Sequence, residues 1–125
     1  MTLLDTNVLI EILKGNEWTR QTVENLDDRL AISSISAMEL FYGALNKAES
    51  KKLERFVSLF HLLHIDESIS MQAMKWIQTY AKSHGLDIPN SLIAATAKVH
   101  DCRLMTYNLK DFRFIKGLEI APISS

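Results

Sequence analysis

Short apolar runs and helical periods alternate along the chain. The runs have the length and composition of buried strands and lie at Leu3 to Leu4, Leu30 to Ser33, Leu62 to Ile65, Leu104 to Tyr107 and Leu118 to Ala121. Between the runs, apolar residues recur at helical spacing, as at Ala37, Leu40, Phe41 and Ala44. Strands that alternate with helices favour βαβ units and a parallel sheet covered on both faces. We therefore expect an α/β fold.

The same helical spacing occurs in two further segments, Leu53 to Phe60 and Ile69 to Tyr80. The stretch from Leu92 to Ala97 is apolar nearly all round, which is typical of a helix buried on several faces. In open parallel sheets, ligands bind beyond the carboxyl ends of the strands, near the point where the strand order reverses. The residues that follow each predicted strand are therefore the first place to look for chemistry.

The length and composition are those of one globular domain, residues 1–125. Of the 125 residues 47% are apolar, and the chain contains no internal repeat, low-complexity tract or linker. Its one cysteine, Cys102, cannot form an internal disulfide, which suits a reducing cytoplasm. No apolar run approaches the roughly 20 residues of a membrane helix, and the chain starts without a basic leader. We therefore expect a cytoplasmic protein with no membrane partner.

Polar residues follow the predicted strands, and each has a purely structural explanation. Asp5 or Thr6 can cap the helix that continues from Val8, by accepting its free backbone N–H groups. Ser36 and Glu39 have the spacing of a capping box. The pair Asn90–Ser91, next to a proline that suits a first helical turn, can cap the buried helix. Taken one at a time, these residues need no function.

Capping does not explain why all these polar side chains are expected at one edge of the sheet. A further acid, Asp111, lies in the turn that follows the fourth predicted strand. Mg²⁺ takes oxygen ligands and is typically held by one or two carboxylates together with substrate phosphates. Acids that converge at the crevice can hold one or two such ions, activate a water and stabilise the charge on a phosphodiester under attack.

Four segments, in this order and spread over the whole chain, resemble the PIN-domain proteins, in particular the ribonuclease toxins of VapBC toxin–antitoxin pairs. The segments are LLDTNVLIEILKG, ISSISAMELFYGA, IPNSLIAATAKVHDCRLMTYNLKDF and IKGLEIAPI. The resemblance implies a five-stranded parallel sheet flanked by helices on both faces and RNA cleavage that depends on Mg²⁺ or Mn²⁺. It also implies a homodimer, and neutralisation by a small VapB-type antitoxin whose tail fills the active-site groove.

Carried over to this sequence, the resemblance assigns four catalytic positions, which are Asp5, Glu39, Asn90 and Asp111. Asp5 and position 90 would hold the metal. The fourth acidic position varies among relatives within the stretch Thr-x-Asn-x-x-Asp, which makes Asp111 the candidate. The polar residues expected to support the site are Asn7, Thr106 and Asn108.

This chain departs from the family pattern at position 90, where Asn stands in the place of an acid. An amide has nearly the shape of a carboxylate but carries no charge, so it should weaken metal binding and impair cleavage. Asn90 is either an engineered change that allows a toxic protein to be produced or a natural change in a relative that has lost or modified its activity. We favour the first, because the surrounding segments are intact. Asp87 is a candidate for compensating the missing charge.

The net charge of −1 offers no general attraction for nucleic acid, so only a local patch can provide one. Lys110, Arg113 and Lys116 follow one another near Asp111 and are candidates for contacts with RNA phosphates. His61 and His64 have a ligand-like spacing but no cysteine partners, which disfavours a zinc site.

Three functions from different classes remain at this stage. The first is a metal-dependent endoribonuclease, with tRNA among its possible substrates. The second is a catalytically inactive module of the same fold that binds RNA or an antitoxin peptide, which Asn90 would permit. The third is a small phosphoacceptor or nucleotide-binding domain with Asp5 as its acid. The sequence contains no Gly-x-Gly-x-x-Gly or Gly-x-x-x-x-Gly-Lys loop, which argues against nucleotide binding.

Overall fold

The structure is a computed structural model that describes residues 1–123. The strands of this part of the chain are β1 (Thr2–Leu4), β2 (Leu30–Ser33), β3 (His61–Leu63), β4 (Arg103–Thr106) and β5 (Ile120–Pro122). The helices are α1 (Thr6–Leu13), α2 (Glu17–Glu24), α3 (Ser34–Tyr42), α4 (Lys47–Val57), α5 (Glu67–His84) and α6 (Ile88–Val99), with a short 3₁₀ helix, η1 (Leu109–Asp111). None of these helices combines the length and apolar character needed to cross a membrane.

The strands form one parallel sheet in the order β3-β2-β1-β4-β5. β1 lies at the centre, with Leu3 opposite Ala31 of β2 on one side and Leu104 of β4 on the other. After β1, the chain adds β2 and β3 on one side of it and then β4 and β5 on the other side. The strand order therefore reverses between β1 and β4. The α/β prediction is confirmed, and the crevice expected for ligands lies at the carboxyl ends of these two strands.

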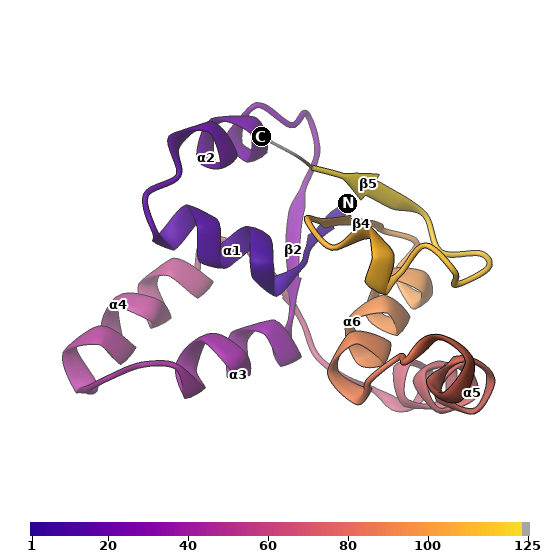
Figure 1. Cartoon of the computed structure of the whole chain (residues 1–125). Coiled ribbons are helices and arrows are strands. Elements are labelled where there is room, and N and C mark those ends of the chain that lie inside the picture. The colour runs from indigo at the N-terminus through magenta and orange to yellow at the C-terminus, as the bar shows by residue number, and fades with distance from the viewer. Residues whose placement is uncertain (124–125) are drawn as a thin grey trace.

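Helices cover both faces of the sheet, with α1 to α4 on one side and α5 and α6 on the other (Figure 1). The two cores follow from the pleat, because successive residues of a strand point to opposite faces. In β1, Leu3 belongs to the core under α5 and α6, whereas Leu4 belongs to the core under the other helices. Both side chains are fully buried. A central strand of such a sheet is therefore buried on both faces, and the one polar residue of β1, Thr2, donates a hydrogen bond to Asp28.

The structure confirms one of the predicted helix caps and corrects two. Asp5 caps α1, and its side chain accepts a hydrogen bond from the backbone N–H of Thr6. The predicted capping box of Ser36 and Glu39 is wrong, because Ser33 caps α3 and Ser36 is buried inside that helix. The prediction that Asn90–Ser91 caps the buried helix is also wrong. α6 begins earlier and is capped by Asp87, which accepts from the N–H of Asn90.

Candidate active site

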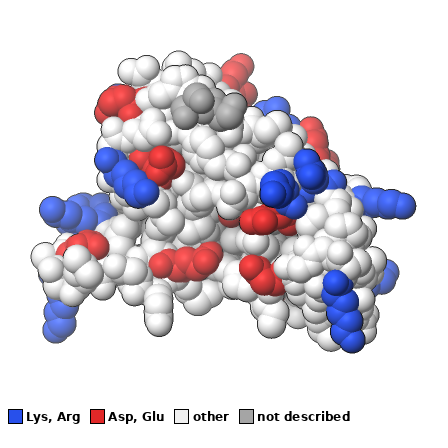
Figure 2. Space-filling view, viewed as in Figure 1, with Lys and Arg blue, Asp and Glu red and all other residues white. Residues whose placement is uncertain are grey.

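The four predicted catalytic positions line one pocket. Its lining residues are Asp5, Thr6, Asn7, Ile10, Glu39, Asn90, Asn108 and Asp111. Four separate segments bring the four candidates together: the end of β1, the second turn of α3, the first turn of α6, and η1. The pocket lies where these segments meet, at the carboxyl ends of β1 and β4. Acidic side chains border the hollow in the middle of this face (Figure 2).

Asp5 is the deepest of the four, with only 5% of the residue exposed. Its Oδ1 accepts a hydrogen bond of 2.8 Å from the backbone N–H of Thr6, and its Oδ2 accepts one of 2.8 Å from the hydroxyl of Thr106. Burial raises the pKa of the Asp5 carboxyl, against the opposing effect of these two hydrogen bonds. The nearby charges of Glu39 and Asp111 raise that pKa further. A negative charge on Asp5 is therefore fixed in place but incompletely compensated.

The three residues expected to support the site lie in one group of hydrogen bonds that reaches Asp5 through Thr106. The Thr106 hydroxyl oxygen accepts hydrogen bonds from Asn7 Nδ2, at 3.3 Å, and from the backbone N–H of Asn108, at 2.9 Å. With both lone pairs used, its one hydrogen is left to point at Asp5. Asn7 is oriented in turn by the backbone N–H of Tyr107, which donates to Asn7 Oδ1 at 3.3 Å.

Glu39 is held by a second chain of hydroxyl groups, which the sequence did not reveal. Its Oε1 accepts a hydrogen bond of 2.9 Å from the hydroxyl of Thr6, which lies 2.8 Å from the hydroxyl oxygen of Ser36. Thr6 has a single hydrogen and gives it to Glu39, so Ser36 is the donor to Thr6. The only signal in the sequence was the spacing of Ser36 and Glu39, which places both on one face of a helix.

Asn90 stands at the third position of α6, where its backbone N–H donates to Asp87 Oδ1 at 2.8 Å. Within residues 1–123 the carboxamide of Asn90 and the carboxylate of Asp111 make no hydrogen bond to protein groups, and both line the pocket. Asp87 does not line it. The carboxylate of Asp87 is engaged as the helix cap and is not placed to replace the charge missing at position 90.

The pocket offers the donors that a hard divalent cation prefers, namely the carboxylates of Asp5, Glu39 and Asp111 and the amide oxygen of Asn90. Burial and, to a lesser extent, the neighbouring acids raise the pKa of Asp5, and a cation bound beside it would favour its charged form. In residues 1–123, no three side chains of His, Cys, Asp or Glu lie closely enough to form a metal-binding group by themselves. This fits an ion such as Mg²⁺, which keeps several of its waters and needs only one or two carboxylates.

Comparison with known proteins identifies the family to which this chain belongs. The PIN domain, as a sequence family, matches residues 2–117. The chain belongs to the PIN domain family. Ribonuclease VapC10 of Mycobacterium tuberculosis is 34% identical over 122 residues, which are 95% of this chain and 91% of that protein. The tRNA(fMet)-specific endonuclease VapC of Salmonella typhimurium is 29% identical over 125 residues, 94% of each chain.

Solved structures of the family share the fold over nearly the whole chain. A toxin–antitoxin complex from Klebsiella pneumoniae contains a chain that superposes with a TM-score of 0.81, at 31% identity, over 94% of this PIN domain and 95% of that chain. The resemblance read from the sequence and the five-stranded parallel sheet are thus confirmed. The assignment of catalytic and metal-binding roles to particular residues of this PIN domain stays a prediction.

The predicted RNA-contact residues of this PIN domain are all exposed. Lys110 lies in η1 beside Asp111, and Arg113 and Lys116 belong to the loop that leads from η1 to β5. Lys and Arg side chains lie next to acidic ones on this part of the surface (Figure 2). Three exposed basic residues therefore lie on the segment that carries Asp111, and their contact with RNA phosphates stays a prediction.

Proposed function

We propose that this PIN domain is an endoribonuclease, the toxin of a toxin–antitoxin pair, and that the pocket around Asp5 is its active site. The observation that carries the proposal is the convergence of four segments on one buried carboxylate, with two further acids and Asn90 around it. The names of the relatives, which are ribonucleases and a tRNA endonuclease, support RNA as the substrate.

Asp5 and Glu39, together with the amide oxygen of Asn90, are the residues that would hold a divalent cation, Mg²⁺ or Mn²⁺. When bound, such an ion stabilises the charge that develops on a phosphodiester and makes a water more acidic. Thr6 and Thr106 fix both oxygens of Asp5, so that its charge stays aimed into the pocket. Asp111, exposed and without a protein partner in residues 1–123, is placed to orient the attacking water and take its proton. No covalent intermediate is required.

The amide at position 90 weakens this site. It contributes an oxygen ligand but no charge and cannot take up a proton. With one anionic group missing, the cation is held less tightly and the attacking water is less well activated. The chain as written therefore cleaves RNA poorly, while its fold stays that of an active relative.

Its partners follow from the same proposal. RNA is the substrate, and a VapB-type antitoxin blocks the pocket with its tail, in which a basic side chain would meet the charges of Asp5, Glu39 and Asp111. The toxin works in the cytoplasm as a homodimer. The second candidate, a catalytically inactive module that binds RNA or antitoxin, is favoured by Asn90 alone. Phosphoacceptance is disfavoured, because both oxygens of Asp5 are engaged and the residue is buried.

The residue roles are tested in a variant that restores the acid, Asn90→Asp. Adding Asp5→Asn should abolish Mg²⁺-dependent RNA cleavage while the circular dichroism spectrum stays unchanged, because Asp5 is the central ligand. Adding Asp111→Asn instead should reduce the rate by less. Near-normal cleavage by the variant that lacks Asp5 would overturn the assignment of the site. Asp66→Asn, which changes an acid outside the pocket, is the control.

A further inference from the structure

A stack of rings stands on the surface beside the catalytic pocket. The imidazole of His84, at the end of α5, stacks on the ring of Phe114 with centroids 4.5 Å apart and planes inclined by 16°. Tyr80 is the third ring of the group, and its centroid lies 5.2 Å from that of Phe114 and 5.7 Å from that of His84. His84 is exposed and Phe114 is half-buried. Core packing therefore explains Phe114 and Tyr80 but not why an exposed imidazole lies flat on Phe114 and edge-on to Tyr80.

The loop that carries Phe114 is held firmly. Phe112 and Ile115 are buried in the core under α5 and α6, which turns the residues between and after them outward. The backbone N–H of Lys116 donates to the hydroxyl oxygen of Tyr80 at 3.3 Å, and Lys98 Nζ donates to the carbonyl of Gly117 at 3.1 Å. The rings therefore form a preorganised surface, which lowers the entropy cost of binding.

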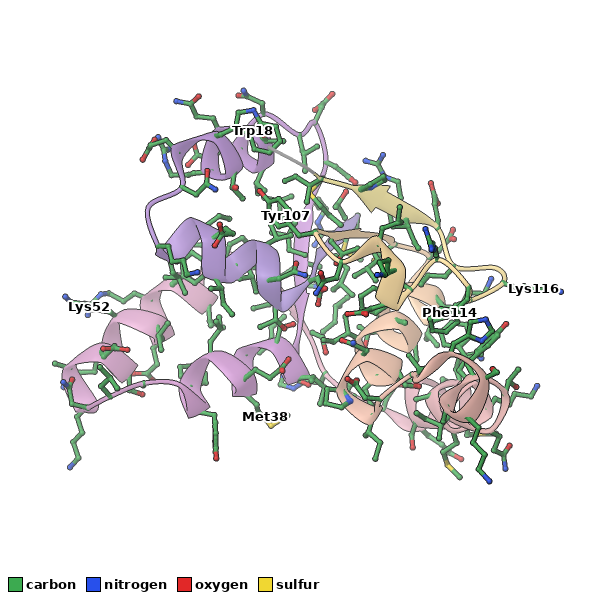
Figure 3. All side chains as sticks on the ribbon, in the orientation of Figure 1. Trp18, Met38, Lys52, Tyr107, Phe114 and Lys116 are labelled. Carbon is green, nitrogen blue, oxygen red and sulfur yellow. The ribbon has the colours of Figure 1, made fainter. Side chains whose placement is uncertain are left out.

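The stack is bordered by cationic side chains. Arg113 and Lys116 flank Phe114 on the same loop, and Lys82 precedes His84 by two residues on α5; all three are exposed. Phe114 and Lys116 lie next to each other above the end of α5, far from Lys52 and Trp18 (Figure 3). Exposed rings bordered by cations suit a ligand that presents both π-faces and negative charge, and single-stranded nucleic acid is such a ligand.

The stack is also within reach of the proposed cleavage site. Phe114 follows Asp111 by three residues, and three residues span at most about 11 Å even when fully extended. An RNA strand that places a phosphodiester in the pocket can therefore reach the stack with a neighbouring nucleotide. Unpaired bases of RNA are commonly bound by stacking on aromatic, histidine and arginine side chains.

We infer that His84 and Phe114 form a subsite that holds an unpaired base of the RNA substrate, with Arg113 and Lys116 contacting the adjoining phosphates. This rests on the proposed ribonuclease function and specifies how its substrate is positioned. The base stacks on the exposed ring of His84, and the phosphates lie along the loop toward Asp111. The preference is for single-stranded RNA next to the scissile bond, because a base inside a duplex cannot reach the ring.

The test measures RNA binding without cleavage. The full chain is titrated in EDTA into a short fluorescein-labelled single-stranded RNA, and binding is followed by fluorescence anisotropy. His84→Ala and Phe114→Leu should each weaken binding by about fivefold or more, since stacking on one ring contributes that much per base. His84→Phe, which keeps a ring, should bind the RNA with an affinity within about twofold of that of the parent chain. Trp18→Ala, which removes an exposed ring on α2, is the matched control and should change nothing.

The phosphate contacts have a separate readout. Lys116→Ala should lower the slope of log affinity against log salt by about 0.7, the value for one contact to a single strand. Lys52→Ala, an exposed lysine on α4, should leave the slope unchanged. Thermal melting of each variant separates loss of binding from loss of fold, and His84→Ala removes an exposed side chain from the end of a helix, so it should melt like the parent.

The outcomes distinguish this subsite from the proposed function. Unchanged RNA binding by folded His84→Ala and Phe114→Leu would overturn the subsite and leave the function standing, provided that the Asn90→Asp form cuts RNA. A chain that binds no RNA would overturn the subsite in any case. If the Asn90→Asp form also fails to cut RNA, the proposed function falls as well.

Discussion

At the scale of single residues, the main feature of the site is a buried carboxylate, that of Asp5. A buried carboxylate is costly unless hydrogen bonds or an opposite charge compensate it. Asp5 has a hydrogen bond on each oxygen, yet its pKa is raised, because burial and the neighbouring acids outweigh those bonds. Under the proposed function, a bound cation would supply the missing compensation. The amide of Asn90 lowers the total negative charge that attracts that cation.

The raised pKa of Asp5 predicts how pH acts on the metal-free protein and on its metal affinity. The folded state favours the neutral carboxyl, so the contribution of Asp5 to the free energy of unfolding is fully present below its unfolded value of 3.8 and is lost as pH rises through the folded pKa. The cation needs the charged form, so its affinity should fall as pH is lowered through that raised pKa.

Calorimetric titration of the Asn90→Asp form with Mg²⁺, from about pH 8 down to about pH 4, near the ordinary pKa of an Asp carboxyl, measures this dependence. We expect weaker binding at the acidic end. The same titration of a form that also carries Asp5→Asn should show little binding at any pH. Affinity for Mg²⁺ that is independent of pH would contradict the account of Asp5.

At the scale of elements, the start of α6 positions the residue on which activity depends. Asp87 caps this helix through the N–H of Asn90, so the residue that should hold the metal and the residue that fixes the helix start are directly joined. Pro89, in the same first turn, has no N–H to leave unpaired and suits that position. The local sequence therefore sets where the side chain at position 90 lies.

Removing this cap should affect both stability and activity. Asp87→Ala should lower the free energy of unfolding by about 1 kcal/mol, because the N–H groups of the first turn lose their acceptor. In the Asn90→Asp background it should also slow RNA cleavage, since residue 90 is no longer held. Urea unfolding and cleavage assays on the same preparation measure the two effects.

Asp66→Ala is the matched control, because Asp66 caps α5 in the same way, accepting from the N–H of Ile69 at 2.9 Å, and does not line the pocket. It should cost a similar amount of stability and leave the cleavage rate unchanged. Equal effects of the two substitutions on cleavage would show that the cap of α6 has no particular role in the site.

The elements also show what the sequence can and cannot reveal. Apolar runs located all five strands to within about two residues, the usual uncertainty of element ends, because a sheet buried on both faces needs them. The helix α2 was missed because most of its residues are polar and only Thr19 and Val23 of it are buried. The cap of α3 was misplaced because Ser33, Ser34 and Ser36 are chemically equivalent candidates, and only the strand end selects Ser33.

For the candidate site, the main positions could be predicted from the sequence, but the contacts between their side chains could not. Its four main positions were assigned by family resemblance, and the structure places all four in one pocket. The bridge from Ser36 through Thr6 to Glu39 was not predicted, because it joins residues 30 or more positions apart and depends on side-chain rotamers. The ring stack of His84 and Phe114 was missed for the same reason, since nothing in either local pattern indicates the other.

At the scale of the whole molecule, the strand order creates the site. Because β1 and β4 are neighbours, Asp5 at the end of one meets Thr106 at the end of the other, although 101 positions separate them. The two helical layers then bring α3 and α6 to the same edge from opposite faces of the sheet (Figure 1). A net charge of −1 leaves any attraction for RNA to local cations, and the exposed Lys110, Arg113 and Lys116 lie on the segment that carries Asp111.

The most direct test of this account compares RNA cleavage by the chain as written and by its Asn90→Asp form, side by side, with Mg²⁺ and with EDTA. Restoring the acid should raise the rate by about tenfold or more, the range in which altered metal-site residues act, and EDTA should abolish the gain. If both forms fold and neither cuts any cellular RNA, the pocket around Asp5 is not a nuclease site, and the protein is a binding module of the PIN fold.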